Sequence, residues 1–190
     1  MKVIAFNGSP RKNGNTKQAI EIVFEELVKE GIETEFIQLV DKKIQHCLSC
    51  YKCLKHKDNK CHGWDDDLND LLAKMLDADG IILGSPTYFA NVSSKIKALI
   101  DRAGLIAKVN GDSLKRKVGV GVIAARRQGA CAVFSDLNFF FLCNEMIVPG
   151  SSYWNLGIGL KPGEIQDDNE GIQTFRNLGK NMAWLMKKIL

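Results

Sequence analysis

The sequence contains no apolar run that approaches the roughly 20 residues needed to span a membrane. Its first residues, Met1–Phe6, are too short for a signal peptide and show no cleavage site. It also lacks a dense Lys/Arg block, and a net charge of +4 is too small to indicate nucleic-acid binding. We therefore expect a cytoplasmic protein that binds neither membranes nor nucleic acid.

Two other absences concern organisation and chemistry. No internal repeat or domain linker interrupts the 190 residues, of which 45% are apolar and 25% charged. These values are typical of one globular domain, here residues 1–190, with a full-sized core. No Ser/His/Asp set or pair of carboxylates is evident, so the sequence gives no sign of acid–base or nucleophilic catalysis by side chains.

Apolar periodicity predicts strands that alternate with helices. We expect strands at 2–7, 34–39, 81–84, 117–124 and 146–149, and helices at 16–29, 68–76, 92–102, 130–144 and 168–190. This alternation indicates an α/β flavodoxin-like three-layer sandwich with a five-stranded parallel sheet in the order 2-1-3-4-5. In that fold the carboxyl ends of all strands share one edge, where ligands bind. Residues 150–166 are expected to form a Gly-rich loop.

Four of the six cysteines stand in one irregular segment, residues 41–64, after the second expected strand. The spacing C-x2-C-x2-C-x7-C is formed by Cys47, Cys50, Cys53 and Cys61. Bacterial ferredoxins use thiols at two-residue gaps as iron–sulfur ligands, although their run ends C-x3-C-P. Zinc sites more often use separated C-x2-C pairs. In the cytosol such clusters bind metal or act in catalysis more often than they form disulfides.

A polar loop of nine residues, 8–16, joins the first strand to its helix. Free amides and the helix dipole at such a helix start favour an anion, and hydroxyls or an arginine in the loop would strengthen the site. The loop has neither the Gly-Lys-Ser/Thr of a P-loop nor G-x-G-x-x-G. We predict a phosphate cradle, with a plain capped turn as the alternative. Its candidate residues are Ser9, Arg11, Gly14, Asn15 and Thr16.

The loops after the third and fourth strands are expected at the same edge. After the third strand, Tyr88 and Phe89 offer rings on which a flat ligand would stack, and Thr87 and Asn91 offer polar groups for its edge. Alternatively, Phe89 packs under its own helix. After the fourth strand, one of two arginines, Arg126 or Arg127, would stabilise a reduced flavin, unless both are simply solvated.

A second glycine pattern, G-x-G-x-x-A at 119–124, lies within an expected strand and does not open a helix. Its context is therefore wrong for dinucleotide binding. We interpret Gly119 and Gly121 as positions where a helix packs closely on the sheet. Cys131 and Cys143 are interpreted as filler residues of the following helix.

Several stretches together carry a family resemblance. They are G-S-P-R-K-N-G-N-T at 8–16, the cysteine run at 47–61 followed by Asp66-Asp67, A-D-G-I-I-L-G-S-P-T-Y-F at 78–89, and K-A-L-I-D-R at 97–102. In these, over residues 1 to about 130, the chain resembles the NADPH-dependent FMN reductase superfamily and, within it, the iron–sulfur flavoprotein family.

The resemblance implies that the 8–16 loop holds the FMN phosphate and that the cysteines bind a four-iron four-sulfur cluster. It also implies homodimers or homotetramers with flavins near the subunit interfaces. The loop after the fourth strand departs from the family, where it is usually richer in glycine. The expected flavin neighbours in the later loops are Pro86, Thr87, Tyr88, Phe89, Asn91, Ala125, Arg126 and Gly129.

From these features we expect a flavin-dependent oxidoreductase that uses ferredoxin or NAD(P)H as electron donor and passes electrons through the cluster and FMN to an acceptor. One alternative is an NAD(P)H-dependent FMN, quinone or nitro-compound reductase without a cluster. Its cysteines would be free thiols, or a zinc knuckle with His46, His56 or His62. Another alternative is a non-catalytic flavin redox sensor. Because the cysteines follow an edge strand, we expect them to face outward, towards the flavin of a neighbouring subunit.

Overall fold

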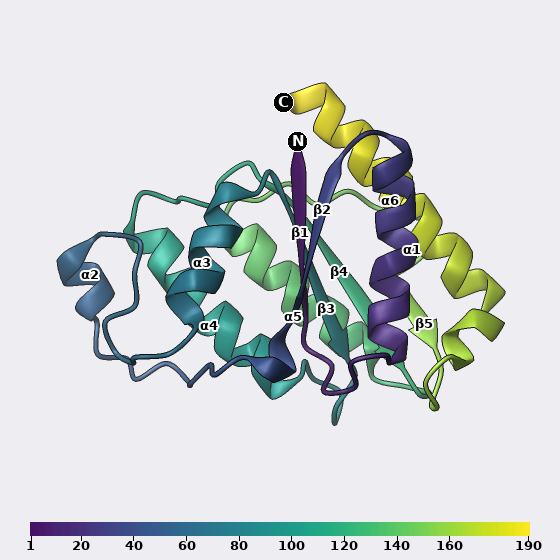
Figure 1. The fold of residues 1–190 in the computed structure, drawn as a ribbon, viewed down its shortest axis with the longest axis horizontal. Coiled ribbons are helices and arrows are strands. Elements are labelled where there is room, and N and C mark those ends of the chain that lie inside the picture. The colour runs from purple at the N-terminus through teal and green to yellow at the C-terminus, as the bar shows by residue number, and fades with distance from the viewer.

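The computed structural model describes all residues, 1–190, and places a five-stranded parallel sheet between two layers of helices (Figure 1). The strands are β1 Lys2–Asn7, β2 Glu33–Gln38, β3 Gly80–Pro86, β4 Val118–Ala125 and β5 Leu156–Ile158. Their order is β2-β1-β3-β4-β5, and every pairing is parallel. This confirms the predicted flavodoxin-like fold, with the cysteine segment following β2.

The helices divide between the two faces of the sheet. On one face lie α1 Asn15–Lys29 and α6 Asn169–Ile189, and on the other α3 Leu68–Asp77, α4 Ser94–Val109 and α5 Ala130–Cys143 (Figure 1). The short helix α2, Lys52–His56, stands apart within the cysteine segment. Two 3₁₀ turns, η1 Leu39–Asp41 and η2 Glu164–Asp167, complete the chain. No helix combines the length and apolar character that crossing a membrane requires.

The strands are buried on both faces, as their nearly continuous apolar runs predict. In β1, Val3 and Ala5 join the core beneath α1 and α6, while Ile4 and Phe6 join the core beneath α3, α4 and α5. All four side chains are fully buried. Full burial of a large apolar side chain contributes roughly 1.5–3 kcal/mol, so both layers hold the sheet and fix where its strand ends lie.

The glycines of β4 serve helix packing, as interpreted from the sequence. A β-carbon at Gly119 would lie 2.5 Å from Phe141 Cδ1, and one at Gly121 would lie 2.9 Å from Leu137 Cδ1. Both neighbours belong to α5. Only glycine therefore lets α5 approach this closely, and Gly119 and Gly121 serve packing and do not line the ligand edge.

The prediction of a fifth strand at 146–149 is wrong. There Ile147 makes only an isolated parallel bridge to Val118, at the start of β4. Pro149 has no N–H to continue such a ladder. The chain pairs with β4 again only at β5, which aligns with residues 123–125 at its carboxyl end. The supposed loop 150–166 thus contains a strand that delivers residues 159–163 to the ligand edge of the sheet.

Candidate functional site

A hollow opens at the carboxyl edge of the sheet. Its cavity volume is about 120 Å³, and it is open to solvent. Loops following β1, β3, β4 and β5 all contribute to it. Its lining residues are Ser9, Arg11, Asn15, Thr16, Pro86, Thr87, Tyr88, Ala124, Arg126, Gly159 and Leu160.

The start of α1 gives one end of the hollow the character of an anion site. No side chain caps this helix at Gly14, and its first turn contains no acidic residue. The amides of Asn15, Thr16 and Lys17 donate to no backbone carbonyl. Three free N–H groups, the positive end of the helix dipole and the nearby Arg11 together favour a negatively charged group such as a phosphate.

The side chain of Asn15 is engaged with the loop after β5. Its Nδ2 donates to the carbonyl of Lys161 at 3.0 Å, and its Oδ1 accepts from the amide of Gly163 at 2.9 Å. Arg11 Nη1 donates to the carbonyl of Leu160 at 2.7 Å. Asn15 therefore positions the 159–163 loop over the cradle and offers a ligand only its backbone amide.

Sequence reasoning missed Gly159 and Leu160, because residues 150–166 were expected to be a plain loop. A β-carbon at Gly159 would lie 2.6 Å from Asn15 Nδ2 and 2.9 Å from the amide nitrogen of Ile165. Only glycine fits at position 159, and its small size lets the 159–163 loop pack against Asn15. The glycines at 157, 159 and 163 could have indicated a tight loop at the ligand edge. They were not read so because the fifth strand was expected at 146–149 and not at 156–158.

Thr87, directly after β3, has a buried hydroxyl that finds no hydrogen-bond partner within the protein. Buried polar groups are nearly always paired, so an unpaired one that lines a hollow suits a polar ligand edge. Beside it, Tyr88 and Asn91 exchange two backbone hydrogen bonds of 3.0 Å around a tight turn. Phe89, at the tip of this turn, is fully exposed, so the alternative that it packs under its own helix is wrong.

The other predicted flavin neighbours lie outside the lining of the hollow. Asn91 Oδ1 accepts from the amide of Val92, and Ala125 is buried in β4. Gly129 has a φ of 89°, and a β-carbon there would lie 3.0 Å from Ala90 Cα. Its lack of a side chain therefore allows the loops after β3 and β4 to lie in close contact. Contacts of Gly14, Phe89, Asn91, Ala125 and Gly129 with a cofactor remain predictions.

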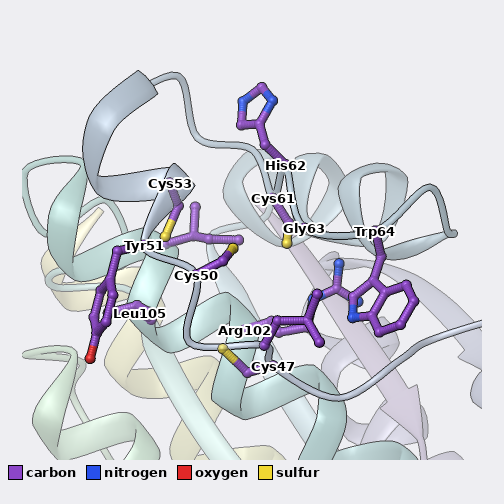
Figure 2. Close-up of a pocket in the computed structure, with 12 residues that line it drawn as sticks. Cys47, Cys50, Tyr51, Cys53, Cys61, His62, Gly63, Trp64, Arg102 and Leu105 are labelled. Carbon is purple, nitrogen blue, oxygen red and sulfur yellow. The ribbon is translucent and has the colours of Figure 1, made fainter.

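The four cysteines of the predicted cluster line a second pocket, shown in Figure 2. A β-carbon at Gly63 would lie 3.4 Å from the sulfur of Cys50 and 3.7 Å from that of Cys61, so these two sulfurs converge. No three Cys, His, Asp or Glu side chains come close enough together to hold a single metal ion. In a four-iron four-sulfur cluster each cysteine thiolate binds a different iron atom. The sulfurs of its four cysteines therefore lie farther apart than the ligands of a single metal ion.

The backbone around these cysteines is unusual. Ser49 and Tyr51, in the two short gaps of the motif, are left-handed, as are Lys57 and Asn59. Such conformations cost roughly 1–3 kcal/mol each and are concentrated at functional sites. Turns of this kind aim amides inward and form the anion-binding concavities of many iron–sulfur sites. One amide, that of Ser49, already donates to the sulfur of Cys47 at 3.4 Å.

The histidines of the segment have other partners. His62 turns away from the sulfurs in Figure 2, pairs with Asp58 at 3.0 Å and stacks on His56. His46 meets Trp64 edge-on. Burial and the neighbouring cysteines raise the pKa of Cys53, so a free thiol there would be a poor nucleophile. These contacts therefore disfavour a zinc knuckle that uses the histidines, and the raised pKa disfavours a reactive thiol at Cys53.

Comparisons with known proteins show the family of this chain. Residues 1–161 match the family model described as NADPH-dependent FMN reductase. The chain belongs to this family. An iron-sulfur flavoprotein of Methanocaldococcus jannaschii is 42% identical over 196 residues, covering 100% of this chain and 99% of the relative. One from Methanosarcina thermophila is 31% identical over 191 residues, covering 100% and 97%.

Solved structures support the fold of this FMN reductase family member. RosB with bound 8-demethyl-8-formylriboflavin-5'-phosphate superposes with a TM-score of 0.78 at 23% identity, covering 100% of this chain and 80% of RosB. An NAD(P)H:quinone oxidoreductase from Methanothermobacter marburgensis gives 0.69 at 16% identity, covering 96% of each chain. At these identities the likeness shows the flavodoxin-like architecture alone.

The cysteine segment of this family member is fastened by residues that are not ligands. Asp66 accepts from both terminal nitrogens of Arg102, at 2.5 and 3.1 Å, and from the amide of Gln45 at 2.9 Å. Asn69 clamps Cys61, accepting from its amide at 2.7 Å and donating to its carbonyl at 3.1 Å. Asp66 and Asn69 thus anchor the segment on both sides of the pocket.

We expect Asp66→Asn to destabilise the protein by about 3–5 kcal/mol at neutral pH, because it breaks a buried pair whose side chains are 3% and 1% exposed. Burial opposes ionisation of Asp66, but hydrogen bonds from Arg102 and backbone amides outweigh it and lower its pKa. This stabilisation is therefore present above the unfolded pKa of about 3.9 and is lost as the pH falls through the lower folded value.

Urea unfolding from pH 7 down to pH 3 checks this prediction. The gap in unfolding free energy between the wild type and Asp66→Asn should narrow at the acid end. Asp65→Asn is the matched control, since Asp65 is exposed and makes no ion pair. A gap that stays constant over the whole range would contradict a stabilising charge on Asp66.

Proposed function

We propose that this protein is an iron–sulfur flavoprotein that passes electrons between a one-electron donor, such as ferredoxin, and an acceptor. The observation that carries the proposal is the cysteine pocket, in which four cysteines surround one space and left-handed residues wind the backbone around it. Full-length relatives that are themselves iron-sulfur flavoproteins support it. When bound, FMN would exchange one or two electrons and a four-iron four-sulfur cluster one electron.

The hollow at the sheet edge would hold the flavin. The free amides at the start of α1, with Ser9, Arg11 and Thr16, would bind the phosphate, and the unpaired hydroxyl of Thr87 would bind a polar edge of the ring. Tyr88 would cover the ring, and Arg126 would supply positive charge beside it. The loop after β5 would close the site and exclude water.

The two sites lie apart within one chain, and no residue lines both. In Figure 1 the cysteine segment with α2 is at one end of the molecule, whereas β5 is at the other. We therefore propose a homodimer or homotetramer in which the cysteines of one subunit approach the flavin of another. Light scattering should give more than one chain per particle. A monomer that still reduces its acceptor at full rate would contradict this arrangement.

A second candidate is an NAD(P)H-dependent reductase of flavins, quinones or nitro-compounds that works without a cluster. The family model favours it, since its description names NADPH and FMN but no iron. In this case NAD(P)H would be the donor, and the cysteine segment would serve only as structure. A flavin redox sensor without turnover is the remaining alternative.

Composition of the anaerobically purified protein separates these candidates. The proposal predicts about four iron and four sulfide per chain, together with one FMN. Flavin without iron would support the second candidate, provided that NAD(P)H bleaches the flavin absorbance. A loaded protein that reduces no acceptor would indicate the sensor. A colourless protein that does not take up added FMN would contradict all three.

A further inference from the structure

Arg102 lies within α4 and lines the cysteine pocket (Figure 2). Its side chain is only 1% exposed. Its two terminal nitrogens donate to Asp66, and Nη1 also donates to the carbonyl of Gln45 at 3.1 Å. Its Nε–H is buried and has no hydrogen-bond partner. One donor of a fully buried cation is therefore left without an acceptor beside four thiols.

The ion pair alone does not explain this unused donor. A carboxylate can bind a guanidinium side-on, through Nε and one terminal nitrogen, which would leave Nε satisfied. Here Asp66 takes both terminal nitrogens, so Nε is left over on the side of the guanidinium that the carboxylate does not occupy. Buried unpaired N–H groups are rare, and each calls for a partner that the protein atoms do not supply.

The surroundings of Arg102 restrict what that partner can be. In the same pocket Leu105 and Ile106 have no side-chain acceptor, His62 is turned away and paired with Asp58, and Tyr51 is exposed. The cysteine sulfurs are the side-chain acceptors that remain for Arg102. A guanidinium stays protonated in proteins, and Asp66 supplies the buried counter-charge. Arg102 thus presents a permanent positive charge and a free N–H to a site made for sulfur ligands.

We propose that the Nε–H of Arg102 donates a hydrogen bond to the iron–sulfur group held by Cys47, Cys50, Cys53 and Cys61. Arg102 is then a positioning residue that stabilises the reduced, more negative state and raises the reduction potential. Hydrogen bonds to sulfur are among the factors that set such potentials. The inference rests on the proposed function, since it requires the cluster, and it assigns the tuning of that cluster to one side chain.

A labelling experiment on the wild type tests the contact directly. The protein is produced with ¹⁵N-guanidinium arginine, reduced, and examined by pulsed EPR. The other five arginines do not line the pocket, so a ¹⁵N coupling to the reduced cluster identifies Arg102. We expect this coupling in the wild type. Its absence in an iron-loaded sample would overturn the inference while leaving the proposed function intact.

A variant tests the consequence for the potential. Arg102→Lys keeps a positive charge for Asp66 but removes Nε, so we expect bound iron and FMN at wild-type levels and a lower cluster potential in a redox titration. Arg176→Lys, an exposed position on α6, is the matched control and should leave the potential unchanged. A merely structural Arg102 would lower thermal stability in Arg102→Lys without moving the potential, and that result would overturn the inference.

Failure of the inference and failure of the proposed function give different results. A wild type that holds no iron after anaerobic purification and reconstitution would overturn both. Iron at full stoichiometry, with no arginine coupling or with an unchanged potential in Arg102→Lys, would overturn only the role of Arg102. If Arg102→Lys does not fold, the labelled wild type still decides the question.

Discussion

Thr16→Asp should remove FMN from the purified protein. Thr16 is buried at the uncapped start of α1, where the free amides would bind the phosphate. An acidic side chain is favoured at a helix start, so the variant should fold while its carboxylate occupies the anion site and repels the phosphate. We expect the affinity for FMN to fall at least tenfold, which corresponds to ~1.4 kcal/mol.

Flavin fluorescence after equilibrium dialysis measures this affinity. Ser94→Asp is the matched control, because it adds an acid at the exposed start of α4, which also has none in its first turn. It should bind FMN as the wild type does. Thr16→Val, which removes only the hydroxyl, should give an intermediate loss. Normal affinity in Thr16→Asp would show that the phosphate, if bound at all, lies elsewhere.

Cys50→Ala should abolish stable iron binding and leave the flavin in place. Cys50 is exposed, so the substitution removes a ligand without opening a cavity in the core. The flavin hollow contains no residue of the cysteine pocket, so its occupancy should not change. Iron per chain should fall from about four to below one.

Iron and FMN assays on the same sample check this second prediction. Cys131→Ala is the control, since Cys131 is also exposed but lies on α5 and outside the pocket. It should retain full iron. Unchanged iron in Cys50→Ala would assign the metal to other residues, and loss of both cofactors would show that the two sites depend on each other.

The sequence predicted the sheet well where strands are buried on both faces. β1, β3 and β4 are apolar over most of their length, and their order follows from parallel crossovers. β5 was missed because its three residues carry no such signal and its pairing depends on where β4 ends. Its neighbour 146–149 is more apolar, but Pro149 stops any ladder there.

Some residues of the two sites could not be predicted, because their roles depend on contacts between distant parts of the chain. Asn15 reaches Lys161, 146 residues away, and no local pattern predicts such a pairing. Arg102 on α4 and Asp66, just before α3, look like ordinary surface charges until the fold buries both. By contrast, the 8–16 loop and the cysteine spacing were recognisable, because strand ends and ligand spacing are local properties of the sequence.

The exposure of Cys50 has a consequence for handling this protein. A metal–sulfur group ligated there would lie within short tunnelling range of the surface, so a redox partner would need to touch only the outside of the molecule. The same openness would admit dioxygen. In air we therefore expect the brown colour of the iron to fade well before the yellow of the flavin.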